Sequence, residues 1–163
     1  AIGDFERIGD HALNLQDSAR ELHDRALSFS GPAEEELRVL VSALEDILED
    51  TLRCFTAADA VSAQSIEPLE ETIDRLIEEI RRRHLARLQA GTCTMQLGFV
   101  LNDLLGNFER VSDHCSNIAV SVIEEKQGGV SRHAYLHELD AGDEFSSILR
   151  SDLGKYRLPE ETA

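Results

Sequence analysis

The sequence predicts an all-α protein, an antiparallel four-helix bundle with a short C-terminal helical tail. Leu, Ala, Glu and Arg are abundant among the 163 residues, whereas aromatic residues make up only 5% and Trp is absent. This composition favours helices over strands. Apolar residues recur at spacings of three and four along four long segments, which is the period of an amphipathic helix. Because only short breaks separate these segments, consecutive helices are expected to pack antiparallel.

The first two helices are expected over residues 1–29 and 32–60. The Ser-Gly-Pro run at 30–32 separates them, since Gly and Pro occupy positions where helices usually stop. Pro32 also suits the first turn of the second helix, and the three Glu residues at 34–36 favour the positive end of its dipole.

The third and fourth helices are expected over residues 61–90 and 94–126. Pro68 lies early in the third helix, where it marks either the first turn or a kink. Gly91 ends the third helix, and the Gly pair at 128–129 ends the fourth.

The chain is expected to divide into a helical bundle over residues 1–129 and a C-terminal extension over 130–163. Within the extension, short helices are expected over 133–139 and 144–156. The last residues, 159–163, are expected to fray.

Charge and cysteine content exclude several classes of function. A formal net charge of −16 repels nucleic-acid phosphates and anionic lipid surfaces, and it suits cation binding as well as plain solubility. No segment approaches ~20 uninterrupted apolar residues, so no direct membrane insertion is expected. Three cysteines without CxxC spacing argue against a disulfide framework and fit a reducing cytosol. The chain opens without Met, so we expect a fragment whose own N-terminus lies upstream.

A duplicated heptapeptide is the best clue to function. The string FERIGDH at 5–11 recurs as FERVSDH at 108–114. Each copy places Glu and Asp one turn apart on one helix face, with His next to the Asp. Two such faces brought together across a helix pair would supply the oxygen and nitrogen donors that a metal site needs. The candidate metal ligands in these copies are Glu6, Asp10, Glu109 and Asp113.

The expected third helix carries a further acidic pair. Glu70 and Asp74 repeat the ExxxD spacing and would form a second wall of the site opposite the fourth helix. His11 and His114 are additional candidate ligands. Carboxylates suit Fe, Mn, Mg or Ca, and imidazole shifts the preference toward Fe, Zn or Ni. The alternatives are ordinary ion pairs, solvated acidic faces and partly buried histidines. The Arg triplet at 81–83 is expected to be solvated and to pair with the abundant acids of the bundle.

Signals for an enzyme are weak. Neither a GxGxxG nor a GxxxxGKS/T phosphate loop occurs in the sequence, and no Ser-His-Asp or Cys-His arrangement stands in a useful context. A di-iron oxidase needs Glu-x-x-His on two helices, a spacing that neither copy of the heptapeptide contains. A non-enzymatic protein is therefore expected, with a carboxylate-bridged metal oxidase as the enzymatic alternative.

The duplicated motif resembles the signature of PhoU proteins, and the likeness extends over residues 1–126. Members of that family have two three-helix repeats, with the signature on the last helix of each. The strings HLARLQAGTCT at 84–94 and KYRLP at 155–159 further resemble the PhoU-like cytoplasmic domain of bacterial Na⁺/phosphate cotransporters. The resemblance implies one and a third repeats: residues 1–29 as the last helix of a truncated first repeat, and 32–129 as the second.

The resemblance also implies a bound iron or zinc cluster. The residues that match the family's metal-binding motif are Glu6, Asp10, Glu109 and Asp113, and those that match the acidic helix facing it are Glu70 and Asp74. Because the first repeat lacks its partner helices, its site is expected to be incomplete.

The leading functional hypothesis is a cytosolic regulatory domain of a sodium-dependent phosphate transporter that modulates phosphate uptake. The alternatives are a free-standing PhoU-type phosphate-signalling adaptor and a simple helical dimerisation module. Expected partners are the transmembrane region of the transporter or phosphate-signalling proteins, with a homodimer as a further expectation because apolar stripes lack cover. The resemblance places the domain in the cytoplasm, at the cytosolic face of the inner membrane if it is fused to the transporter.

Overall fold

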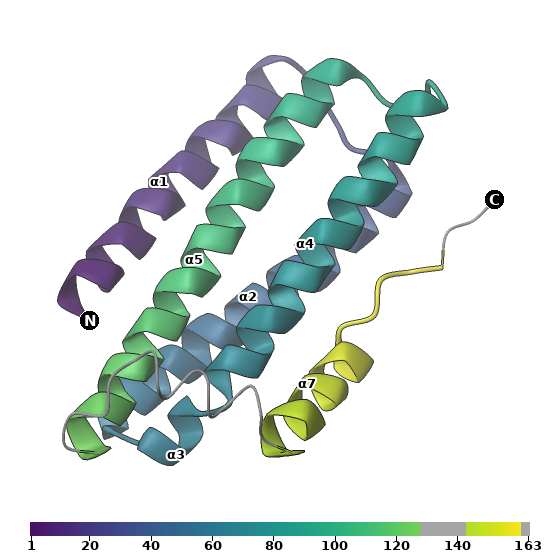
Figure 1. Ribbon diagram of the computed structural model, residues 1–163. Coiled ribbons are helices and arrows are strands. Elements are labelled where there is room, and N and C mark those ends of the chain that lie inside the picture. The colour runs from purple at the N-terminus through teal and green to yellow at the C-terminus, as the bar shows by residue number, and fades with distance from the viewer. Residues whose placement is uncertain (128–142, 161–163) are drawn as a thin grey trace.

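The computed structural model describes residues 1–127 and 143–160, which form an all-helical bundle (Figure 1). The helices are α1 (Ile2–Asp24), α2 (Gly31–Ala57), α3 (Ala60–Ala63), α4 (Ile66–Gln89), α5 (Met95–Gln127) and α7 (Asp143–Lys155). No strand occurs in either described range, so the predicted all-α bundle is confirmed. None of the described helices has the length and apolar character needed to cross a membrane. The helix predicted over 133–139 lies outside the described residues.

Helix α5 is the centre of the bundle. It packs against α1, α2 and α4, and Figure 1 shows it between α1 on one side and α4 on the other, with α2 behind. The side chains that are fully buried among these helices include Leu40 and Ile47 on α2, Ile73, Ile77 and Ile80 on α4, and Leu105 and Ile118 on α5. Burial of each such Leu or Ile stabilises the fold by roughly 1.5–3 kcal/mol relative to exposure.

Helix α1 stops before the predicted residue 29. The backbone turns at Ala26, whose φ is 49°, and the Leu27 amide donates a hydrogen bond to the Leu22 carbonyl at 2.9 Å. Gly and Pro at 31–32 therefore open α2 instead of closing α1. Pro fits this position because the amide hydrogen that it lacks would have no partner in a first helical turn.

The segment predicted as one third helix forms two helices. After α2, Ala58 adopts a left-handed conformation with a φ of 50°. Asp59 then caps α3 by accepting hydrogen bonds from the amides of Val61 and Ser62 at 3.0 and 3.3 Å, so a new helix starts there. Pro68 is buried in the first turn of α4, the first of the two roles predicted for it.

The C-terminal extension is held against α4 and α2. Helix α7 packs along α4, as Figure 1 shows. Lys155, the last residue of α7, and Tyr156, which follows it, both donate hydrogen bonds to Asp46 on α2, the lysine at 2.6 Å. Arg83 on α4 donates a hydrogen bond to the carbonyl of Pro159 at 2.7 Å, so the prediction that Pro159 frays is wrong. Residues 161–163 of that prediction lie outside the described residues.

A buried ion-pair network joins α2 to α4. Glu36 is only 2% exposed, and Arg87 binds its carboxylate through two contacts of 2.7 and 2.9 Å. Arg83 adds a longer contact of 3.4 Å to the same carboxylate. Arg83 is therefore mostly buried, which corrects the expectation that the whole arginine triplet is solvated.

Replacement of Glu36 by Ala should destabilise the fold by about 3 kcal/mol, because it leaves buried guanidinium charge without its partner. Urea unfolding followed by circular dichroism measures the free energy of unfolding. Glu35→Ala is the matched control, since Glu35 is an exposed neighbour on the same helix and its loss should cost less than about 0.5 kcal/mol. Equal losses in the two variants would contradict a stabilising role for the ion pair.

Candidate functional site

Five carboxylates meet where α4 and α5 run side by side in opposite directions. Glu67, Glu70 and Asp74 follow one another on α4 at spacings of three and four, so they share one face of that helix. Glu109 and Asp113 lie one turn apart on α5 in the same way. These five residues are called the carboxylate cluster below.

Contacts across the two helices follow their antiparallel register. At one end of the cluster, Ser116 on α5 donates a hydrogen bond to Glu67. In the middle, Glu70 lies close enough to Asp113 for the two carboxyl groups to affect each other, since Asp113 raises the pKa of Glu70.

An arginine closes the other end of the cluster. Arg81 on α4 binds the carboxylate of Glu109 at 2.8 Å, and both side chains are 40% exposed. Because this pair is open to solvent, it contributes little to stability. Its main effect is to place one positive charge beside the cluster.

Burial and mutual repulsion raise the pKa values of two members of the cluster. Burial raises the pKa of Glu70 to about 9, and the charges of Asp74, Glu67 and Asp113 act in the same direction. Burial also raises the pKa of Asp74 to about 6, with further repulsion from Glu109 and Asp113. The cluster therefore holds more negative charge than its surroundings compensate, as functional sites often do.

The chemistry of the donor set fits a hard cation. Carboxylate oxygens are the ligands that Fe, Mn, Mg and Ca prefer, and a positive ion would offset the repulsion within the cluster. One buried oxygen, Oδ1 of Asp74, makes no hydrogen bond in the described structure and is free to accept a ligand.

The side chains nevertheless do not form a ready-made metal site. No group of three or more His, Cys, Asp or Glu residues within 1–127 and 143–160 is arranged so that it could hold a metal ion. The carboxylates of Glu67 and Glu109 contact Ser116 and Arg81 instead. Coordination would therefore require these side chains to turn toward a common point.

The first copy of the motif lies apart from the cluster. Glu6 and Asp10 on α1 are exposed, and neither makes a hydrogen bond or ion pair within the described parts of the chain. Helix α1 packs chiefly on α5, so no acidic helix faces these two residues as α4 faces α5. The structure thus brings together four of the six predicted carboxylate ligands: Glu70, Asp74, Glu109 and Asp113.

The two candidate histidines join α1 to α5. Nδ1 of His11 lies 2.9 Å from the side-chain oxygen of Asn107, and Nδ1 of His114 lies 3.1 Å from a carboxylate oxygen of Asp4. The two imidazole rings stack with their centroids 5.8 Å apart. Each histidine therefore uses one ring nitrogen in a contact between helices, which matches the alternative role of a partly buried polar residue.

These contacts follow an internal two-fold relation. Asp4 directly precedes the first heptapeptide, and Asn107 directly precedes the second. The histidine of each copy contacts the residue that precedes the other copy, as in an isologous contact between two like helices. Helix packing alone can therefore explain why the histidine is repeated. It does not explain the repeated Glu and Asp, which lie outside these contacts.

Two residues of the site lie outside the predicted set of ligands. Glu67 completes the three-and-four spacing with Glu70 and Asp74, so the same pattern extended one turn earlier would have found it. Arg81 belongs to the triplet that was expected to be solvated and to pair with acids, but the acid was not predicted. Its partner Glu109 is on another helix, and no local spacing in the sequence indicates that pairing.

In the presence of a chelator, the Glu70→Gln variant should be more stable than the parent protein at neutral and alkaline pH. A carboxyl whose pKa is about 9 in the folded state and 4.5 otherwise contributes stability that is complete below pH 4.5 and is lost as the pH rises toward 9. The melting temperatures of variant and parent should therefore be similar near pH 5 and differ by several degrees at pH 8 to 9.

Thermal unfolding followed by circular dichroism across this pH range measures the difference. Glu49→Gln, an exposed position on α2, is the control and should leave the profile unchanged. A profile of the Glu70 variant that parallels that of the parent would contradict a protonated Glu70.

Comparison with known proteins identifies relatives of this chain. A family model described as the PhoU domain matches residues 37–122. A phosphate-specific transport system accessory protein PhoU homolog of Pseudomonas aeruginosa is 30% identical, over 82% of this chain and 54% of that protein. PhoU homolog 1 of Thermotoga maritima is 26% identical over 86% of this chain and 60% of its own length. The PhoU homolog of Pseudomonas putida is 27% identical over 99% of this chain and 62% of its own length.

The chain thus spans about three fifths of the length of these curated relatives. No solved structure matches it significantly. The relatives are named as accessory proteins of phosphate-specific transport systems, in agreement with the expectation of a non-enzymatic protein. Because the PhoU model matches more than half of its residues, including the signature on α5, the chain belongs to the PhoU domain family.

Proposed function

We propose that this chain is a PhoU-type regulator of phosphate transport that acts through protein contacts and holds a metal cation at its carboxylate cluster. The observation that carries this proposal is the cluster itself. It lies within the segment matched by the PhoU model, on the helix that bears the signature and on the helix that faces it. Its raised pKa values mark negative charge that the protein does not compensate.

A phosphate-signalling adaptor has more support than a domain fused to a sodium-dependent phosphate transporter. The relatives are named as accessory proteins of phosphate-specific transport systems, and these names do not mention a cotransporter. The fused arrangement stays a prediction that rests on the strings at 84–94 and 155–159. A cytosolic location and a homodimer also stay predictions, which cell fractionation and sedimentation velocity can test.

Iron suits the cluster better than zinc does. Glu70, Asp74, Glu109 and Asp113 would hold the cation, and all of them offer oxygen. Protein zinc sites usually include Cys or His ligands, whereas the candidate histidines are engaged between α1 and α5. A bound cation would offset the repulsion between the acidic residues of α4 and α5.

Glu109→Gln combined with Asp113→Asn should remove at least about nine tenths of the metal that the wild-type protein retains after incubation with ferrous iron, because both changes delete charged ligands. Elemental analysis after gel filtration measures the retained metal. The melting temperature of the wild-type protein should also rise with iron, and that of the variant should not.

The chain offers a matched control in its own repeat. Glu6→Gln with Asp10→Asn makes the same two changes at the same spacing on α1, where no acidic helix faces them, and should retain the metal. Equal metal content in the two double variants, or none in the wild-type protein, would remove the cation from the proposal and leave the regulatory role to be tested alone.

The regulatory role is tested in cells. Deletion of the gene that encodes this chain should alter the dependence of phosphate uptake on external phosphate, measured with radiolabelled phosphate. The wild-type gene and the Glu6/Asp10 variant should restore that dependence, and the Glu109/Asp113 variant should not. Unchanged uptake after deletion would contradict a role in phosphate transport.

A further inference from the structure

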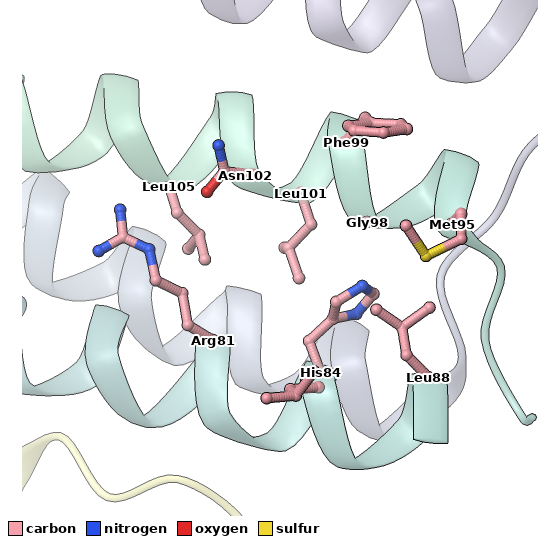
Figure 2. Close-up of a pocket in the computed structure, with 10 residues that line it drawn as sticks. Arg81, His84, Leu88, Met95, Gly98, Phe99, Leu101, Asn102 and Leu105 are labelled. Atoms are coloured by element: carbon pink, nitrogen blue, oxygen red, sulfur yellow. The ribbon is translucent and has the colours of Figure 1, made fainter. Parts of the chain in front are cut away.

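An apolar hollow lies between the C-terminal part of α4 and the beginning of α5 (Figure 2). It encloses about 390 Å³. Its base is formed by buried side chains, among them Leu101 and Leu105, which are 2% and 0% exposed. Figure 2 shows the ring of His84 projecting from α4 into the space between the two helices.

Three large apolar side chains at this hollow are exposed to solvent. Leu85 is 55% exposed, Met95 is 66% exposed and Phe99 is 68% exposed. Such a group around an open apolar hollow is typical of a site that another protein covers. Methionine adapts its shape to a partner surface, which suits it to this role.

The surface between α4 and α5 becomes acidic next to this hollow. An adjoining hollow of about 260 Å³ is lined by two arginines, Arg75 and Arg81, by Ile77, and by four acids, Glu71, Asp74, Glu78 and Glu109. Arg81 lines both hollows, so they lie next to each other between α4 and α5, and the two together are called the furrow below. Each of the two arginines already pairs with an acid of the protein, Arg75 with Glu71 at 2.7 Å and Arg81 with Glu109 at 2.8 Å. The acids of this part therefore outnumber the bases.

An apolar end followed by an acidic end complements a basic amphipathic helix. Such helices seat their apolar face in a groove between two helices, with Lys and Arg at the margin. From Asp74 to Leu88, α4 advances by roughly 14 residues, or ~21 Å at the rise of an α-helix. A partner helix of about four turns can therefore reach both ends of the furrow.

A second copy of this chain is a poorer occupant. With a net charge of −16 on each molecule, a second copy would bring further negative charge toward the acidic end. Anionic lipid surfaces and nucleic acids are disfavoured for the same reason. A segment with positive charge gains attraction from the same field.

We propose that the furrow between α4 and α5 binds a basic amphipathic helix of a partner protein. One apolar side chain of that helix occupies the hollow beside Met95 and Phe99, and its Lys or Arg side chains lie against Asp74 and Glu78. This surface goes beyond the proposed metal site and does not need bound metal. A cation at the carboxylate cluster would compete with the basic end of the helix, because both neutralise the same acids.

The absence of Trp from the sequence gives a direct assay. The probe is a synthetic Leu/Lys amphipathic peptide of about five turns with a single Trp on its apolar face, whose fluorescence then reports binding alone. Titration in chelator at physiological salt should give saturable binding. Met95→Ser with Phe99→Ser should weaken that binding by about tenfold or more, since anchors at the centre of an interface dominate affinity.

Ile2→Ser with Leu13→Ser is the matched control. These side chains on α1 are 84% and 61% exposed and lie outside the furrow, so this variant should bind the peptide like the wild-type protein. Both double variants change exposed positions and should keep the helical circular dichroism spectrum. A scrambled peptide of the same composition should bind the wild-type protein about tenfold more weakly. The variant Asp74→Asn with Glu78→Gln should bind the original peptide with a smaller dependence on salt concentration.

Two results would overturn the proposal. If the scrambled peptide or the Met95/Phe99 variant binds as tightly as its parent, net charge alone explains binding. If sedimentation shows a dimer of the free protein that the Met95/Phe99 variant dissociates, a second copy occupies the furrow. The assay contains no metal, so either result leaves the test of the metal site unaffected.

Discussion

Helix α5 must be covered on three sides at once, and this requirement determines where α1, α2 and α4 lie. Helices α2 and α4 cover it with apolar side chains, and α1 covers a further side. Apolar burial is not directional, so it does not by itself set how far one helix slides along another. Polar contacts at the edges supply that register: His11 and His114 between α1 and α5, and Ser116 with Glu67 between α5 and α4.

The carboxylate cluster results from this packing and lowers the stability of the fold. Apolar stripes bring α4 and α5 together, and the acids beside those stripes are then held close to one another although they repel. The pKa of Glu70 is raised, so this residue stays protonated at neutral pH, and Glu109 forms an ion pair with Arg81. A core that buries many Leu, Ile and Val side chains can tolerate such a site. Repulsion between neighbouring side chains that the rest of the fold holds in place is typical of functional positions.

The repeated heptapeptide serves two different needs. Its histidines form a nearly symmetrical contact between α1 and α5, which requires both copies. Its Glu and Asp residues acquire close acidic neighbours only in the second copy, where α4 faces α5. The same furrow then passes from these acids to the exposed Met95 and Phe99, so the chemical site and the apolar surface share one pair of helices.

The sequence predicted the helical class, the extents of α2 and α5 and the acidic faces of α4 and α5, because helical period and the ExxxD spacing are set within one or two turns of a single helix. It placed the end of α1 too late and missed the separate α3, since these depend on a left-handed turn near Ala26 and on the cap at Asp59. The packing of the helices determined that Arg81 closes the cluster and that the histidines lie between α1 and α5. These outcomes depend on the register between helices far apart in the chain, and no local pattern of residues specifies that register.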